Sequence, residues 1–170
     1  ASRLVCEAIG VPPHWAGRCE DAFHAAHDGS RGALEKRLDE LIAGGRFPKF
    51  EEKIAQLGSY GGGNHFGECE VVSVSPDPRL RRVADAFGLA EGKIAFLSHC
   101  GSRGFGHDLA MGQFRALQQR FAAKGIPLPG GDRELVYAEL GSTEADRYLD
   151  DMALGANFAT VNHLLINALV

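Results

Sequence analysis

Two short runs of this 170-residue chain combine glycine with side chains that bind metal ions and phosphate. Residues 61–68 read Gly-Gly-Gly-Asn-His-Phe-Gly-Glu, so three glycines precede an amide, an imidazole, an aromatic ring and a carboxylate. Residues 99–107 read His-Cys-Gly-Ser-Arg-Gly-Phe-Gly-His. Glycine lets a ligand approach the backbone closely, and the polar groups beside it then contact that ligand. We expect the two runs to meet in space and to form one metal and phosphate site.

The first run offers His65 as a metal ligand. Imidazole suits zinc, manganese or iron, and Glu68 is placed to be a second ligand, to orient the first, or to accept a hydrogen bond. The alternative is that His65 is a hydrogen-bonded structural histidine, which is the commoner role of a single histidine in a fold.

The second run follows an almost continuous apolar stretch at residues 93–99, which is typical of a strand buried on both faces. His99 ends that stretch and is a second candidate ligand. Ser102 and Arg103, among glycines, offer a hydroxyl, a guanidinium and backbone amides to a phosphate. The alternative is an ordinary glycine-rich turn with a solvated arginine. We expect His107 only to open the next helix.

Composition favours one soluble domain, residues 1–170. Hydrophobic residues make up 45% and charged residues 24%, and the net charge of −4 argues against nucleic-acid binding by bulk charge alone. The four cysteines are too few and too scattered for a disulfide scaffold. No apolar run approaches the roughly 18 residues of a transmembrane helix. These features predict a cytoplasmic protein with no membrane partner.

Helical periodicity predicts helices at 31–43, 108–123 and 143–168, and a short helical turn near 51–57. Ser30 is the expected cap of the first helix, Gly44-Gly45 its end, and Ser142 or Thr143 the cap of the last. The inner stripe expected for the helix at 108–123 consists of Leu109, Phe114, Leu117 and Phe121.

Strands are predicted at 66–74 and 93–99, with a brief strand-like piece at 135–138 and a turn at 75–78. For residues 79–87 a solvated loop is favoured over a short basic helix. The expected fold is α+β, a mixed sheet with flanking helices. Both ends of the chain read as if it were part of something longer.

At these two runs the chain resembles the RtcB family of RNA-splicing ligases. Members carry a GGGNHF-x-E segment and, downstream, an H-x-GSRG-x-GH segment. A looser match covers Tyr148, Met152 and residues 156–162, ending at Asn162. Together the matches span about residues 58–163, and the expected fold is like the central region of such a ligase.

The resemblance implies a GTP- and Mn²⁺-dependent ligase that joins RNA 3′-phosphate or 2′,3′-cyclic phosphate ends to 5′-hydroxyl ends, as in tRNA splicing and RNA repair. By position, His65 and His99 would bind manganese. Asn64, Phe66 and Glu68 would contact the guanylate, and Ser102 and Arg103 would hold RNA phosphate. Expected partners are broken RNA ends such as tRNA halves, GTP or GMP, and an archease-type activating protein.

The chain departs from the family pattern in several places. No Asp-x-x-Cys segment precedes Gly61, Cys100 stands where serine is usual, and Gly67 stands where an aliphatic residue is usual. His163 follows Asn162 in place of arginine and does not match the motif of the guanylylated histidine, so we expect that nucleophile to lie outside this chain. Two alternatives stay open: a non-catalytic phosphate- or RNA-binding module, and a metal-dependent phosphodiester hydrolase.

Overall fold

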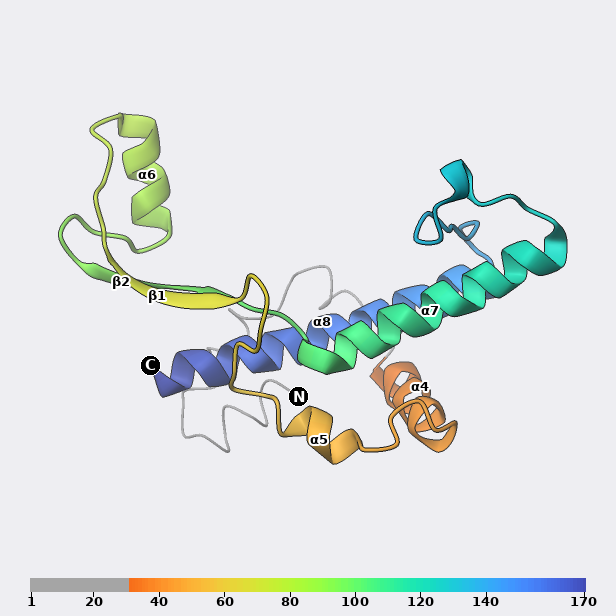
Figure 1. The fold of residues 1–170 in the computed structure, drawn as a ribbon. Coiled ribbons are helices and arrows are strands. Elements are labelled where there is room, and N and C mark those ends of the chain that lie inside the picture. Colours follow the sequence, from red (N-terminus) through yellow and green to blue (C-terminus); the bar gives the residue numbers. More distant parts are fainter. Residues whose placement is uncertain (1–30) are drawn as a thin grey trace. The chain divides into compact units, whose positions relative to one another are not determined.

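A computed structural model describes residues 31–170, which form two compact units (Figure 1). The helical unit consists of residues 31–59 and Gly101–Val170, and the hairpin unit of Tyr60–Cys100. The helical unit contains, in chain order, α4 (Arg31–Ala43), α5 (Phe50–Ile54), α7 (Arg103–Lys124), the 3₁₀ turn η2 (Pro129–Gly131) and α8 (Thr143–Leu169). The hairpin unit contains β1 (Phe66–Val71), α6 (Pro78–Ala86) and β2 (Ile94–His99). The α+β class is therefore confirmed.

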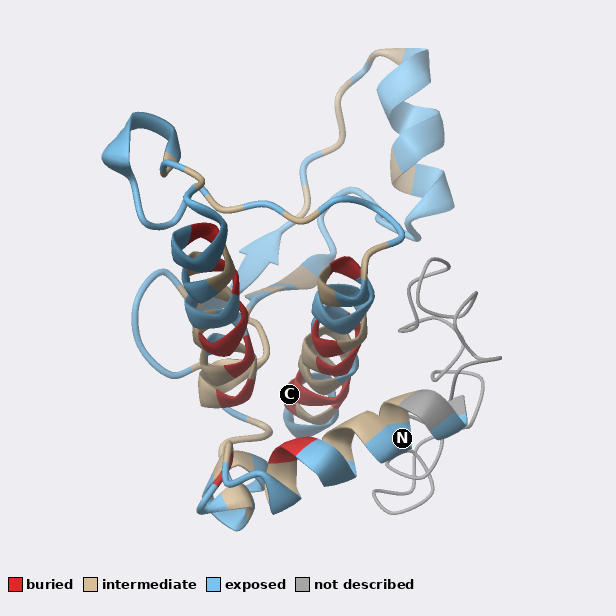
Figure 2. Ribbon diagram, turned by 90° about the vertical axis from the view of Figure 1, so that its right-hand side faces the viewer, coloured by how far each residue is buried: buried red, intermediate tan, exposed pale blue. Residues whose placement is uncertain are grey.

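The long helices α7 and α8 run side by side in opposite directions (Figures 1 and 2). They come close at a pair of glycines, since a Cβ built on Gly155 would lie only 3.8 Å from the Cα of Gly106. A buried cluster then joins α7 and α8 to α4 and to Phe47, which follows α4. Its buried members are Leu41, Phe47, Phe105, Leu109 and Leu154.

Local signals explain where these helices begin and end. α4 ends as predicted, because Gly45 adopts φ 73° and the amide of Arg46 donates to the carbonyl of Leu41 over 2.9 Å. α8 begins as predicted at Ser142, whose hydroxyl accepts from the amide of Ala145 over 3.2 Å. The predicted cap Ser30 lies outside the described residues.

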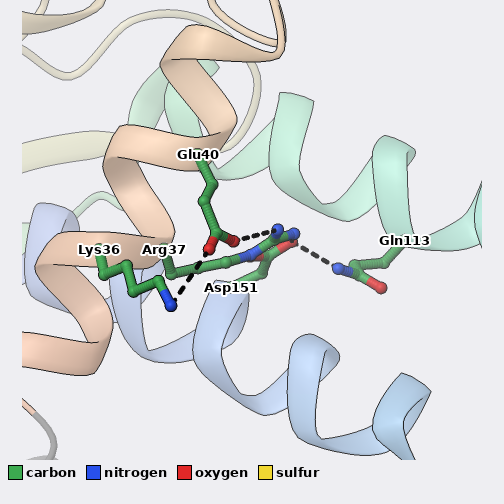
Figure 3. Close-up of polar contacts among 5 residues, drawn as sticks. All are labelled: Lys36, Arg37, Glu40, Gln113 and Asp151. Carbon is green, nitrogen blue, oxygen red and sulfur yellow. Dashed lines mark hydrogen bonds and ion pairs between the residues drawn. The ribbon is translucent and has the colours of Figure 1, made fainter.

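A polar cluster around a buried carboxylate links α4, α7 and α8 (Figure 3). The carboxylate of Asp151 on α8 is 3% exposed. The guanidinium of Arg37 on α4 donates to both of its oxygens, over 2.8 and 3.1 Å, and Gln113 on α7 donates to one of them. The hydrogen bond to Asp151 raises the pKa of Arg37. One carboxylate therefore links α4, α7 and α8.

The hairpin unit is built on one antiparallel ladder. Phe66 of β1 lies opposite His99 of β2, and the register continues to Val71 opposite Ile94. Among the described residues the sheet has only these two antiparallel strands, whereas the sequence predicted a mixed sheet. β1 ends at Val71, three residues before the predicted end.

Residues 94–99 form the predicted strand, β2. The prediction that this strand is buried on both faces is wrong. Ile94 is 75% exposed and Leu97 49%, and no residue of the hairpin unit is buried. A strand is buried on both faces only where other layers cover the sheet. Within the described residues, this two-stranded sheet has no such layer in its own unit.

The structure corrects two further predictions. Residues 79–87 belong mostly to helix α6 and not to a loop, because Asp77 accepts from the Arg79 amide over 2.8 Å and Pro78 occupies the first turn. Hydrogen bonds from the Arg79 guanidinium and amide lower the pKa of Asp77. Residues 135–138 form no strand. Tyr137, in this segment, packs edge-on against Phe121 of α7, with ring centroids 4.9 Å apart.

Candidate functional site

The hairpin unit brings the two candidate ligands, His65 and His99, together. His65 directly precedes β1 and His99 ends β2, so the register places them at the same end of the ladder. Their ring centroids are 6.0 Å apart. The ring of Phe66 lies nearly parallel to that of His99, with centroids 5.5 Å apart and planes 14° from each other.

The glycine run determines which nitrogen of His65 is available. Its Nδ1 lies 2.9 Å from the carbonyl oxygen of Gly62. A carbonyl can only accept, so this contact requires the proton on Nδ1 and leaves the lone pair of Nε2 for a ligand. Metal-binding histidines commonly donate their second N–H to a backbone carbonyl in this way. The run 61–65 therefore has a local geometry suited to a metal ligand.

The other candidates of the first run surround this pair. Phe66 and Glu68 share one face of β1, because alternate residues of a strand point the same way. Asn64, Phe66 and Glu68 are all exposed, so each is accessible to a ligand. No group of three or more histidine, cysteine, aspartate or glutamate side chains converges as a metal centre anywhere in residues 31–170. The hairpin unit thus offers two imidazoles, and not a complete ligand set.

The opposite face of β1 has no space for a side chain at Gly67. A Cβ there would overlap the phenol ring of Tyr60 and lie 2.9 Å from the ring of Phe96. The hydroxyl of Tyr60 lies 3.2 Å from that of Ser98, the residue opposite Gly67 in the ladder. Tyr60 thus fills the space that an aliphatic side chain would need, which explains why glycine is compatible with this position.

We expect Gly67→Val to destabilise the hairpin unit by about 2 kcal/mol, because it must displace Tyr60 and break its contact with Ser98. Gly62→Val is the matched control, since a Cβ at Gly62 meets nothing within 4 Å. Amide hydrogen exchange across β1 and β2 measures the difference. Equal exchange rates in the two variants would show that the Tyr60 packing is unimportant.

Ser102 and Arg103 belong to the helical unit, at the start of α7. The backbone of Arg103 has φ 54°, in the left-handed region that residues other than glycine rarely adopt. The amide of Gly104 donates to Oε1 of Gln56 over 3.0 Å, so it is not an open anion-binding amide as the sequence suggested. α7 begins five residues before the predicted start, so His107 is an exposed residue within the helix and does not open it.

Asn162 on α8 has a role that the sequence did not predict. It is 0% exposed. Its Oδ1 accepts from the amides of Gly58 and Ser59, over 2.8 and 3.3 Å. Its Nδ2 donates to the carbonyls of Ser59 and Gly101, over 3.2 and 3.0 Å. A polar residue on the apolar face of a helix was the available signal, but its partners lie at least 61 positions away.

Comparison with known proteins shows the family to which the chain belongs. The family model described as tRNA-splicing ligase RtcB matches residues 11–170. This match covers nearly the whole chain, and the chain therefore belongs to the RtcB family.

Curated relatives named tRNA-splicing ligase RtcB support this assignment. The Pyrococcus horikoshii protein is 37% identical over an alignment of 155 positions, and the match covers 82% of this chain and 17% of the relative. The Thermococcus kodakarensis protein is 36% identical over 155 residues, covering 82% of this chain and 31% of the relative. The Nanoarchaeum equitans protein is 42% identical over 112 residues, covering 65% and 22%. The chain thus spans less than a third of the length of each of these three relatives.

In the part of the chain that the structure describes, no helix has both the length and the apolar character needed to cross a membrane.

Proposed function

We propose that this chain supplies the metal- and guanylate-binding part of a GTP- and Mn²⁺-dependent RNA ligase. Such an enzyme joins RNA 3′-phosphate or 2′,3′-cyclic phosphate ends to 5′-hydroxyl ends. Membership of the RtcB family supports the ligase class. The observation that carries the proposal is the pairing of His65 and His99 at one end of the hairpin, with ring centroids 6.0 Å apart.

The spacing of the two imidazoles fits a single divalent ion. A metal–imidazole bond of about 2.1 Å puts the ring centroid about 3.2 Å from the ion, so two rings on one ion have centroids at most about 6.4 Å apart, and the observed 6.0 Å lies within that limit. The contact between Nδ1 of His65 and the Gly62 carbonyl directs Nε2 toward a ligand. When bound, Mn²⁺ would polarise phosphoryl oxygens and offset their charge.

The neighbouring side chains would bind and orient the nucleotide. Glu68 is exposed on the same strand face as Phe66, and Asn64 is exposed directly before His65. An amide and a carboxylate can hydrogen-bond the base and ribose of a guanylate, and an aromatic ring can stack on its base. Ser102 and Arg103 in the helical unit would bind RNA phosphate, since a guanidinium pairs bidentately with phosphate oxygens.

We assign no residue of this chain as the guanylylated nucleophile. In this proposal the residues of this chain bind the metal ion and position the guanylate and the RNA phosphate. The covalent steps are proposed for the complete ligase. Broken RNA ends such as tRNA halves, GTP and an archease-type activator are the corresponding proposed partners.

We expect His65→Ala and His99→Ala each to weaken Mn²⁺ binding at least about tenfold, because each removes one of two first-sphere nitrogens. The measurement is a titration followed by the electron paramagnetic resonance signal of free Mn²⁺. His107→Ala is the matched control, since His107 is an exposed histidine on α7. Unchanged Mn²⁺ affinity in both His65→Ala and His99→Ala would refute the metal-binding role.

A further inference from the structure

The imidazole pair lies at the end of the hairpin where its strands are not connected to each other. β1 and β2 are joined through α6 beyond Val71 and Ile94, so that end of the ladder is closed by the chain. His65 and His99 are at the opposite, open end, next to the Phe66–His99 pair. A two-stranded hairpin is only marginally stable by itself and separates most easily at its open end. We call the chain segments that lead from the helical unit into β1 and from β2 back to the helical unit the two arms of the hairpin. The distance between the imidazoles therefore depends on what keeps these two arms together.

Asn162 joins those two arms at their roots. One arm leaves the helical unit after Gly58 and Ser59, and the other returns at Gly101, two residues after His99. Asn162 binds the first arm through both its carbonyl oxygen and its amide nitrogen, and binds the second arm through the amide nitrogen. The α8 backbone holds the asparagine itself, so the two arms are fixed to one rigid point.

The chemistry of this contact requires a carboxamide. Only a group that carries an acceptor and two donors can accept from Gly58 and Ser59 and also donate to Ser59 and Gly101. Aspartate has the same shape, but an ionised carboxylate cannot donate to the two carbonyls. Because Asn162 is 0% exposed, water does not replace the lost partners without rearrangement.

We propose that Asn162 is a positioning residue, which holds the open end of the hairpin closed and thereby sets the separation of His65 and His99. It does so through hydrogen bonds to Gly58, Ser59 and Gly101, without touching either histidine. The consequence for metal binding rests on the proposed function of the histidine pair. The consequence for the hairpin itself does not.

The test compares Asn162→Asp with Asn157→Asp in the 170-residue chain. Asn157 is an exposed asparagine on the same helix, so the control makes the same chemical change without touching the arms. Asn162→Ser, which buries no new charge, replaces Asn162→Asp if the latter does not fold. The first readout is amide hydrogen exchange by NMR, resolved along β1, β2, α7 and α8.

We expect the amides of Phe66–Glu68 and Leu97–His99 to exchange about tenfold faster in the Asn162 variant than in the control, with α7 and α8 changed much less. Nuclear Overhauser contacts between the rings of His65 and His99 should weaken. Equal exchange in variant and control would overturn the proposal. A uniform acceleration that includes α7 and α8 would also overturn it, because Asn162 would then only stabilise the fold.

The second readout is Mn²⁺ affinity, measured on the same samples. We expect the Asn162 variant to bind about tenfold more weakly than the control while its melting temperature falls only slightly. If the parent chain binds no Mn²⁺ but the open end still loosens, the metal-binding function fails and the positioning role stands. If the parent binds Mn²⁺ and the Asn162 variant binds equally well, the positioning role fails and the metal-binding function stands.

Discussion

Replacing Phe105 by alanine is expected to lower the free energy of unfolding by about 4 kcal/mol. Phe105 is 2% exposed. Its ring stacks between those of Phe47 and Phe158, with centroids 4.8 and 4.6 Å away, and contacts Phe50 edge-on at 6.1 Å. Truncation would leave a cavity where α7, α8 and the segment after α4 meet. Denaturant unfolding followed by circular dichroism measures the loss.

Phe114→Ala is the matched control, because it makes the same truncation on the same helix at a half-buried position. We expect it to lower the free energy of unfolding by about half as much or less, since less apolar area returns to water. A loss for Phe114→Ala equal to that for Phe105→Ala would contradict the assignment of Phe105 to the centre of the core.

Arg37→Met is expected to lower the free energy of unfolding by about 3 kcal/mol, because it leaves the Asp151 carboxylate in the interior without its cation. Gln113 still donates to Asp151, but a neutral amide does not balance the charge. Lys36→Met provides the control on the same helix. The Lys36 side chain is 80% exposed, and its ion pair with Glu40 is long, at 3.9 Å. We therefore expect Lys36→Met to change the free energy of unfolding by no more than about 0.5 kcal/mol.

A double variant separates charge from packing in this cluster. If the cost of Arg37→Met comes from the isolated carboxylate, adding Asp151→Leu should recover part of the lost stability. If the cost comes from lost contacts of the arginine stem, the double variant should be less stable than the single one. Chemical denaturation of the two single variants and of the double variant distinguishes these outcomes.

The predictions that succeeded were those with local causes. The end of α4 at Gly44-Gly45 and the start of α8 at Ser142 depend on residues within one helical turn, and the structure has both. The same kind of signal was misjudged at α6. Asp77 followed by Pro78 caps a helix, but a basic and mostly polar sequence after a proline turn favoured a loop.

Other features could not be predicted because they depend on distant parts of the chain. An apolar run at 93–99 cannot show whether other layers cover it, and Ile94 is exposed in this hairpin. Phe105 lies in a glycine-rich run whose pattern indicated phosphate binding, but its ring packs in the core of the helical unit. The structure places His65 near His99. The hydrogen bonds of Asn162 to Gly58, Ser59 and Gly101 could not be derived from spacing.

The backbone at Arg103 has a consequence for how this position can change. A left-handed φ of 54° costs an arginine about 1 kcal/mol relative to glycine. Glycine would relieve that strain but would remove the guanidinium proposed to bind RNA phosphate. Under the proposed phosphate-binding role, folding stability would favour glycine at position 103, whereas binding of phosphate would favour arginine.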